Sequence, residues 1–170
     1  PLKPILGMPM VGHVWHRAKR SLLLDEVYVA PSEPEIAEYL DTIGAKWVMC
    51  KNTHNRASDQ TTDAMEQIEA KTGKQIDVVV MIQGDEPMVT PEMIDLAVEP
   101  FFYPNPSVDV VNLMAPITTR LEHQDPNCPK VVVDRNNNAL YFSREPIPSD
   151  KKWDRKDPRP CYKQVCVIPF

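Results

Sequence analysis

Features that mark membrane, secreted and nucleic-acid-binding proteins are missing from this sequence. No apolar run approaches the roughly 20 residues that a membrane-spanning helix needs. Residues 1–4 (PLKP) lack the charged start and the apolar stretch of a signal peptide. The formal net charge is −5, whereas proteins that bind nucleic-acid polymers usually present a basic surface. We therefore expect no membrane insertion and no nucleic-acid polymer as a partner. A nucleotide substrate stays open, because a few local cations and a metal ion suffice to hold its phosphates.

Cysteine and histidine are scarce, with four residues of each. The cysteines are too few for a disulfide scaffold, and their spacing matches no zinc-binding pattern. They are Cys50, Cys128, Cys161 and Cys166. We expect them to be reduced thiols in a cytoplasmic protein. His13 and His16 lie three residues apart on an expected helix without cysteine or carboxylate partners nearby, which is typical of a helix surface rather than of a metal site.

The sequence also lacks an initiator methionine, internal repeats and low-complexity tracts. Its length of 170 residues suits one compact domain, which we expect to span residues 1–170. The ending, residues 165–170, is typical of a strand that stops part-way. We expect that Pro1 is not the natural start and that the sequence is a piece of a longer protein.

Hydrophobic periodicity predicts alternating helices and strands up to about residue 116. Helices are expected over residues 9–23, 34–43 and 61–71 and from Pro91 onward, and strands over 26–30, 46–50, 77–82 and 108–115. Ser32 and Thr90 are expected to cap helices, and residues 51–59 to form a loop. The run 78–82 (VVVMI) is apolar on both faces, which is typical of a strand in the middle of a parallel sheet covered by helices. The alternation predicts an α/β fold with an open, mostly parallel sheet.

The pattern changes after residue 116. Strands are expected over 130–134, 139–143 and 164–168. The three asparagines at 136–138 favour a tight turn between the first two, so we expect a β-hairpin excursion from the main sheet.

The segment Gln83-Gly84-Asp85-Glu86-Pro87 follows the expected central strand directly. In open α/β sheets, ligands bind beyond the carboxyl ends of the strands. A carboxylate at that place is suited to Mg²⁺, which favours one or two carboxylates together with phosphate oxygens. Gly84 allows a ligand to approach the backbone closely. The segment is therefore either a metal site or an acidic turn that merely ends the strand.

Two motifs carry a resemblance to a known family. Residues 79–87 (VVMIQGDEP) and 140–148 (LYFSREPIP) resemble the 3-deoxy-manno-octulosonate (Kdo) cytidylyltransferases. Residues 1–13, 25–30 and 162–170 resemble further stretches of that family in the same order, so the resemblance covers nearly the whole sequence.

The resemblance implies a Rossmann-like nucleotidyltransferase fold, with a mostly parallel open sheet, helices on both of its faces and a β-hairpin excursion. It implies the transfer of CMP from CTP to a 2-keto sugar acid, with pyrophosphate released, for lipopolysaccharide or other surface polysaccharide. It also implies Mg²⁺ as the cofactor, a homodimer and a cytoplasmic location.

The same resemblance assigns roles to individual residues. Asp85 resembles the metal-binding aspartate, and Gln83 a residue near the nucleotide sugar and the acceptor sugar. Arg144 resembles an arginine of the sugar-acid pocket, where a planar guanidinium suits a carboxylate; the alternative is a surface ion pair. The implied catalytic residues are Asp85, Gln83 and Arg144, the nucleotide-binding residues Arg56, Ser58, Asp59, Gln83 and Gly84, and the substrate-binding residues Arg144, Gln164 and Lys130.

The sequence departs from the family at the expected base-binding loop. A Gly-rich phosphate loop is expected before Pro1, and a second metal-binding aspartate after Phe170. Residues 54–60 (HNRASDQ) stand where the family often has H-x-S-G-T-[DE]-R, with Gln60 in place of the arginine. Either Arg56 supplies the missing cation or the base is recognised differently, while Ser58 and Asp59 match best.

A further departure lies near the end of the sequence. Residues 163–168 (KQVCVI) stand where the family usually has K-H-[IL]-G-[IV]-Y, so Gln164 replaces a histidine of the sugar pocket and Ile168 a tyrosine. Three alternatives therefore stay open. They are a cytidylyltransferase for another sugar acid of the amino-Kdo or nonulosonate type, a nucleotide-binding module that has lost catalysis, and an α/β binding domain of another family.

Overall fold

The computed structural model describes residues 1–50, 56–103, 108–149, 151 and 160–170. The chain forms two compact units, one of Pro1–Val111 with Cys166–Phe170 and the other of Asn112–Val165. The single domain that we expect over residues 1–170 stays a prediction. No helix in the described part of the chain is long and apolar enough to cross a membrane.

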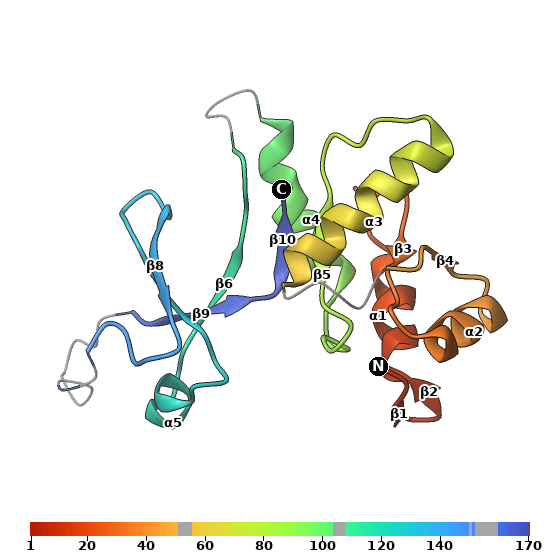
Figure 1. The fold of residues 1–170 in the computed structure, drawn as a ribbon. Helices are drawn as coiled ribbons and strands as arrows, with labels where there is room; N and C mark the ends of the chain where they lie inside the picture. Colours follow the sequence, from red (N-terminus) through yellow and green to blue (C-terminus); the bar gives the residue numbers. More distant parts are fainter. Residues whose placement is uncertain (51–55, 104–107, 150, 152–159) are drawn as a thin grey trace. The chain divides into compact units, whose positions relative to one another are not determined.

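The first unit opens with a hairpin and a helix that is shorter than expected. β1 (Pro4–Ile5) pairs with β2 (Met8–Pro9), and α1 follows over Met10–Ala18 (Figure 1). The helix expected over 9–23 ends at Ala18, because residues 21–23 form hydrogen bonds with the side chain of Asp95 instead of continuing the helix. The Ser21 hydroxyl and the amides of residues 22 and 23 donate to the carboxylate of Asp95. Burial alone would raise the pKa of Asp95, but these hydrogen bonds outweigh it and lower the pKa.

A parallel β–α–β unit follows, made of β3 (Tyr28–Val29), α2 (Pro34–Thr42) and β4 (Lys46–Trp47). β3 and β4 pair in parallel, as the alternating pattern predicts. The expected cap at Ser32 is wrong, because Glu33 takes the N-cap position directly before Pro34 and makes no side-chain cap bond. The core at this place consists of buried Val11, Ile36, Leu40 and Ala45.

α3 spans Ala57–Thr72 and ends at Gly73, which adopts a left-handed conformation with φ of +68°. The predicted end of this helix, at residue 71, agrees well with the structure. Its predicted start at Thr61 is later than the observed start at Ala57. The loop expected over 51–59 is wrong from Ala57 onward, and residues 51–55 lie outside the described residues.

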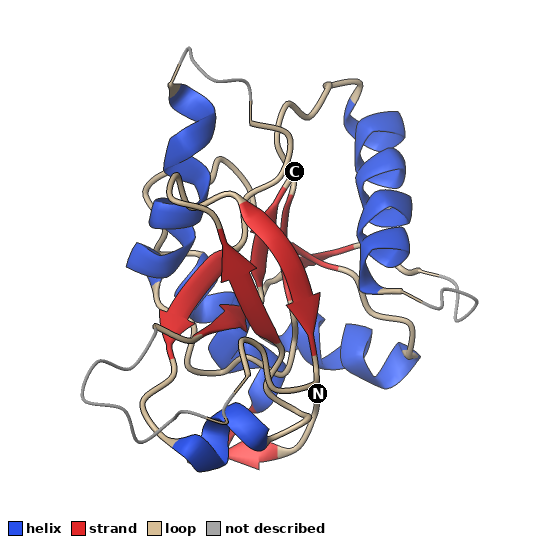
Figure 2. Cartoon of the chain, turned by 90° about the vertical axis from the view of Figure 1, so that its left-hand side faces the viewer, coloured by secondary structure: helices blue, strands red, loops and turns tan. Residues whose placement is uncertain are grey.

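The strand with the strongest apolar run pairs with a strand from the far end of the sequence. β5 (Val80–Ile82) lies antiparallel to β10 (Val167–Pro169), and Val79 exchanges two backbone hydrogen bonds with Phe170. β5 is half-buried, and its hydrogen-bonded partner in the described part is antiparallel where a parallel neighbour was expected. Sheets that mix both directions are common in this class. The predicted α/β class is confirmed (Figure 2).

α4 (Pro91–Val98) begins as predicted. The Thr90 hydroxyl accepts a hydrogen bond from the Met93 amide at 3.3 Å, and Pro91 occupies the first turn. α4 contacts β10 and buries Ile94 and Ala97, and a short 3₁₀ helix, η1 (Glu99–Phe102), continues it.

The second unit contains a four-stranded antiparallel sheet in the order β6-β9-β7-β8. The strands are β6 (Leu113–Pro116), β7 (Lys130–Val133), β8 (Ala139–Ser143) and β9 (Tyr162–Val165), and a short helix, α5 (Arg120–Gln124), precedes β7. The predicted β7–β8 hairpin is confirmed. The single strand expected over 164–168 is wrong, because the chain bends at Cys166 and separates β9 from β10. The strand expected over 108–115 begins only at Leu113.

One partly solvated ion pair stabilises the second unit. Glu122 accepts a hydrogen bond from the ammonium of Lys163, which lowers the pKa of Glu122 and raises the pKa of Lys163. Because the folded pKa of Glu122 is the lower one, its contribution to stability is present above the unfolded pKa of about 4.3 and is lost as pH falls through the folded pKa.

We therefore expect Glu122→Gln to lower the free energy of unfolding at neutral pH by about 1 kcal/mol or less. The difference from wild type should shrink as the pH is lowered below the unfolded pKa of about 4.3 and through the folded pKa. Urea unfolding of the full chain across this pH range measures it. Glu145→Gln, at an exposed carboxylate of the same unit, is the control. An equal loss from both substitutions, or a loss independent of pH, would show that the ion pair does not stabilise the unit.

Candidate functional site

The segment Gln83–Pro87 forms two consecutive turns immediately after β5. The Glu86 amide donates to the Gln83 carbonyl at 3.2 Å, and the Val89 amide donates to the Glu86 carbonyl at 3.0 Å. Asp85 is exposed and Gln83 is half-buried. A Cβ placed on Gly84 would meet no atom of the described residues within 4 Å. The turns therefore present the Asp85 carboxylate to open space beside a backbone that a ligand can approach.

Residues of two helices, α1 and α4, fix the carboxyl end of this loop. Val89 is buried, and its carbonyl accepts a hydrogen bond from the guanidinium of Arg17 on α1 at 3.4 Å. The next residue, Thr90, caps α4. The loop is therefore fixed at its carboxyl end, while the described part of the chain leaves space for a ligand at Gly84.

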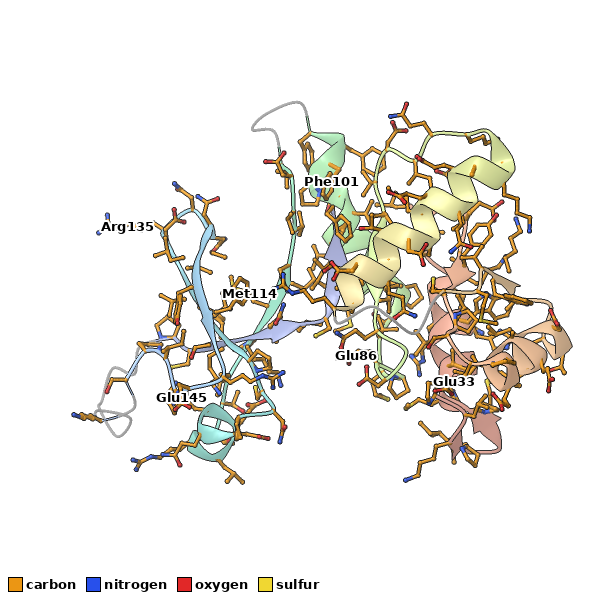
Figure 3. The ribbon with its side chains drawn as sticks, in the orientation of Figure 1. Glu33, Glu86, Phe101, Met114, Arg135 and Glu145 are labelled. Carbon is orange, nitrogen blue, oxygen red and sulfur yellow. The ribbon has the colours of Figure 1, made fainter. Side chains whose placement is uncertain are left out.

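Two adjacent carboxyl groups make the loop negative. Glu86 is half-buried, and burial together with the charge of Asp85 raises the pKa of Glu86 (Figure 3). Burial is the larger cause, and the negative charge of Asp85 adds to it; a cation at Asp85 would reduce that second contribution.

The donor set at the loop suits a magnesium ion that arrives with a nucleotide. No group of three or more His, Cys, Asp or Glu side chains that could hold a metal occurs among the described residues. A closed, all-protein site of the calcium or zinc kind is therefore not formed by this part of the chain. Mg²⁺ keeps several water ligands and is usually held by one or two carboxylates and the phosphates of the substrate. The exposed Asp85 fits that arrangement.

The predicted nucleotide-binding residues of the first unit also include the start of α3. Arg56 is the N-cap residue, and Ser58 and Asp59 lie in the first helical turn; all three are exposed. Residues 54 and 55 of the same motif lie outside the described residues.

Gln60 has a role that the sequence does not reveal. Its side-chain amide donates to the carbonyl of Ala30, at the end of β3, at 2.7 Å. The backbone carbonyl of Gln60 accepts a hydrogen bond from the thiol of Cys50 at 3.7 Å. These contacts attach the first turn of α3 to the segments that follow β3 and β4. The amide of Gln60 is therefore engaged inside the fold, and Arg56 is an exposed cation at this helix start.

In the second unit, Arg144 directly follows β8 and is exposed. Its Nη1 donates to the carbonyl of Pro126 at 2.9 Å. Within the described residues it has no carboxylate partner, which does not favour the alternative of a surface ion pair. The remaining N–H groups of its guanidinium are available to an anion.

The two other predicted substrate-binding residues of this unit are engaged with protein groups. Lys130 is fully buried, and its ammonium donates to the carbonyls of Asp125 and Arg144. Gln164 is half-buried, and its amide donates to the side-chain oxygen of Asn112. Asn112, which the sequence reading missed, donates in turn to the carbonyl of Val165 at 3.0 Å. The Gln164 amide group is thereby oriented, and among the described residues no donor binds its side-chain oxygen.

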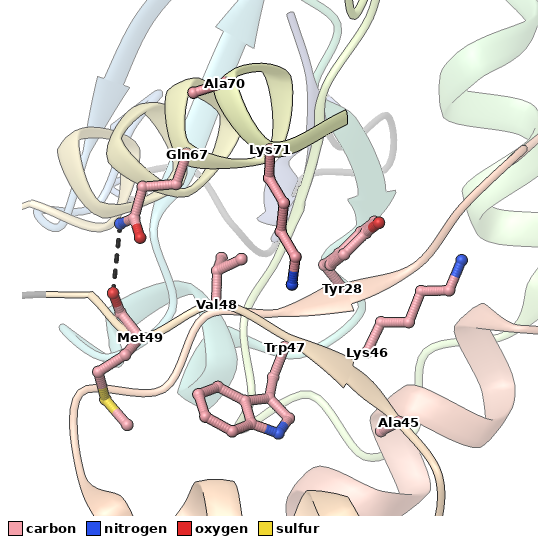
Figure 4. A pocket seen from close by; sticks show the side chains of 9 residues that line it. All are labelled: Tyr28, Ala45, Lys46, Trp47, Val48, Met49, Gln67, Ala70 and Lys71. Atoms are coloured by element: carbon pink, nitrogen blue, oxygen red, sulfur yellow. Dashed lines mark hydrogen bonds between the residues drawn. The ribbon is translucent and has the colours of Figure 1, made fainter. Parts of the chain in front are cut away.

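A cavity of about 920 Å³ lies in the first unit, between β4 and the second half of α3 (Figure 4). Tyr28, Trp47, Val48 and Lys71 line it, and Gln67 donates to the carbonyl of Met49 at its edge. None of the predicted site residues lines this cavity. The volume of this cavity therefore does not identify the predicted nucleotide or sugar-acid site.

The parallel pairing of β3 with β4 and the mixture of helices and strands define an α/β fold, in which an exposed carboxylate follows β5. A solved structure of CMP:2-keto-3-deoxy-manno-octonic acid synthetase complexed with CTP is similar to the chain with a TM-score of 0.86 and 30% identity, over 100% of this chain and 66% of that chain. The family model for cytidylyltransferases matches residues 1–165. The chain belongs to the cytidylyltransferase family.

Curated relatives are similar over most of the chain. A 3-deoxy-manno-octulosonate cytidylyltransferase of Pelobacter propionicus is 36% identical over 94% of this chain and 63% of its own length. One of Geobacter metallireducens is 37% identical over 96% of this chain and 65% of its own length. The family that residues 79–87 and 140–148 predict is thereby confirmed. The chain spans less than two thirds of the length of these relatives.

Proposed function

We propose that the full-length protein transfers CMP from CTP to a Kdo-like 2-keto sugar acid and releases pyrophosphate. The observation that carries the proposal is the exposed carboxylate of Asp85, on a turn directly after β5 that α1 and α4 hold from behind. Membership of the family and the similarity to a synthetase complexed with CTP support it.

Asp85 is the proposed metal ligand, and Gln83 the residue that orients hydroxyl groups of the substrates. Gly84, Arg56, Ser58 and Asp59 are the further proposed nucleotide-binding residues. A bound Mg²⁺ would supply charge neutralisation at the phosphates. Exposure of Asp85 and the open space at Gly84 support this assignment.

Arg144 is proposed to bind the carboxylate of the sugar acid, and the free acceptor oxygen of Gln164 to receive a sugar hydroxyl. In the reaction, the anomeric hydroxyl oxygen forms a bond to the α-phosphorus of CTP. The bond from that phosphorus to the bridging oxygen breaks, pyrophosphate leaves, and the hydroxyl proton passes to solvent. Positioning and charge neutralisation supply most of the acceleration of such a step.

The product would serve lipopolysaccharide or other surface-polysaccharide synthesis, and the protein would act in the cytoplasm as a homodimer. β8 supports the dimer, because it is an edge strand of its sheet in the described part. It leaves Leu140 65% and Tyr141 64% exposed, whereas monomers usually protect such an edge.

We expect light scattering of the full-length protein to give a dimer and Leu140→Glu to give a monomer. A wild-type monomer would contradict this part of the proposal.

The proposal is tested with full-length protein, CTP, Mg²⁺ and a panel of sugar acids. The panel contains Kdo, its 8-amino analogue and a nine-carbon nonulosonate. Release of pyrophosphate is expected to be fastest with Kdo. Faster release with another acid would support the alternative sugar. Binding of CTP without release for any acid would show a module that has lost catalysis.

A further inference from the structure

Lys130 is the largest fully buried side chain among the described residues. A lysine is almost never fully buried unless its ammonium is paired, because removing the charge from water is costly. In the described part of the chain, the partners of this ammonium are two backbone carbonyls, those of Asp125 and Arg144, and no carboxylate. Such a costly arrangement calls for a role beyond filling the core.

The two carbonyls belong to separate turns. Asp125 directly follows α5, and Arg144 directly follows β8. Lys130 itself begins β7, opposite Ser143 in the hairpin. The ammonium therefore joins three segments at the open end of the β7–β8 hairpin.

The side chain of Arg144 returns to the same turn. Its Nη1 donates to the carbonyl of Pro126, next to the carbonyl of Asp125 that Lys130 binds. Lys130 thus fixes the backbone of Arg144 and also the turn on which its guanidinium rests. Arg144 is exposed, and its hydrogen bond to Pro126 restrains the direction of its guanidinium.

We propose that Lys130 is a positioning residue for Arg144 and does not contact the substrate. It holds the backbone of Arg144 and the turn at Asp125–Pro126 so that the guanidinium is pre-oriented for the carboxylate of the sugar acid. The inference rests on the proposed role of Arg144. Preorganisation of this kind raises affinity because less freedom is lost when the ligand binds.

Lys163 offers a matched comparison. It lies directly opposite Lys130 on β9, but it is partly exposed and its ammonium pairs with Glu122. Removing its charge therefore alters the same sheet without removing a hydrogen bond to Arg144 or to the carbonyl of Asp125.

The test is a double-mutant cycle in the full-length enzyme with Lys130→Met, Arg144→Ala and both together. We expect Lys130→Met to raise the KM for the sugar acid about tenfold, with kcat and the KM for CTP nearly unchanged. Added to Arg144→Ala, it should have no further effect, because residues that act through one another are not additive. Lys163→Met should leave the KM for the sugar acid unchanged.

Effects of Lys130→Met and Arg144→Ala that multiply would overturn the inference, and so would an equal rise in both KM values. If Lys130→Met does not fold, Lys130→Gln, which keeps N–H donors, replaces it in the same cycle.

A readout that needs no catalysis separates this inference from the proposed function. The side-chain N–H signal of Arg144 in the nuclear magnetic resonance spectrum of the ligand-free protein should show an ordered group in wild type. In Lys130→Met it should become mobile, and in Lys163→Met it should stay ordered. An unchanged Arg144 signal in Lys130→Met would overturn the inference. Absence of pyrophosphate release by wild type would instead contradict the proposed function.

Discussion

Replacing Asp85 with asparagine in the full-length protein is expected to reduce Mg²⁺-dependent release of pyrophosphate by about a thousandfold. The substitution keeps the size and shape of the side chain, but it replaces one acceptor oxygen by an NH2 group and removes the charge that would hold a divalent ion. Asp85 is exposed on a turn whose framework is backbone hydrogen bonds, so the fold should not change. Steady-state kinetics over a range of Mg²⁺ concentrations measure the effect.

Glu92→Gln is the matched control, because it also removes an exposed carboxylate close to the loop, at the first turn of α4. It should retain activity within about twofold of wild type, as expected for a surface change away from the reacting groups. Near-normal turnover of Asp85→Asn would remove Asp85 from the mechanism. Equal losses in the two variants would point to the general charge of this region instead.

Arg144→Ala is expected to raise the KM for the sugar acid by about a hundredfold while the KM for CTP changes little. A charge-assisted, two-point bond between a guanidinium and a carboxylate is among the strong hydrogen bonds, and its loss at a binding site has an effect of this order. Arg144→Lys should recover only part of the loss, because an ammonium keeps the charge but not the planar pair of donors.

The control for this prediction is Arg135→Ala. Arg135 is an exposed arginine in the turn of the same hairpin and makes no ion pair within the described residues (Figure 3). It should leave both KM values unchanged. A similar rise in both KM values for Arg144→Ala would show that Arg144 supports the structure of the hairpin rather than binding the acid.

Local features of the fold could be predicted from sequence because their causes are local. Thr90 followed by Pro91 is a typical helix start, and in the structure Thr90 is the N-cap residue of α4. The asparagines at 136–138 likewise predict the β7–β8 hairpin, where Asp134 accepts bonds from the amides of residues 136 and 138 and Asn137 has φ of +64°.

Features set by distant residues could not be predicted. β5 is an apolar run that suits either strand direction, and only its pairing with β10, more than eighty residues later, makes it antiparallel. α1 ends early because Asp95, on α4, binds the residues that would continue it.

The candidate site likewise contains features that the sequence could predict and features that it could not. Asp85 and Arg144 stand in short motifs, so the sequence identifies them as candidates and the structure finds both exposed. Lys130 also stands in a motif, but nothing in the sequence indicates that its ammonium is buried against two carbonyls. Gln60 looks like a lost base-binding residue in the sequence, whereas its bond to Ala30 gives it a structural role.

The proposed role of Asp85 can be tested by a crystal structure of the full-length protein with CTP and Mg²⁺. We expect a carboxylate oxygen of Asp85 to ligate the metal ion and the same ion to contact the phosphates of the nucleotide. A nucleotide-bound metal ion with Asp85 turned away from it would show that Asp85 is not the metal ligand.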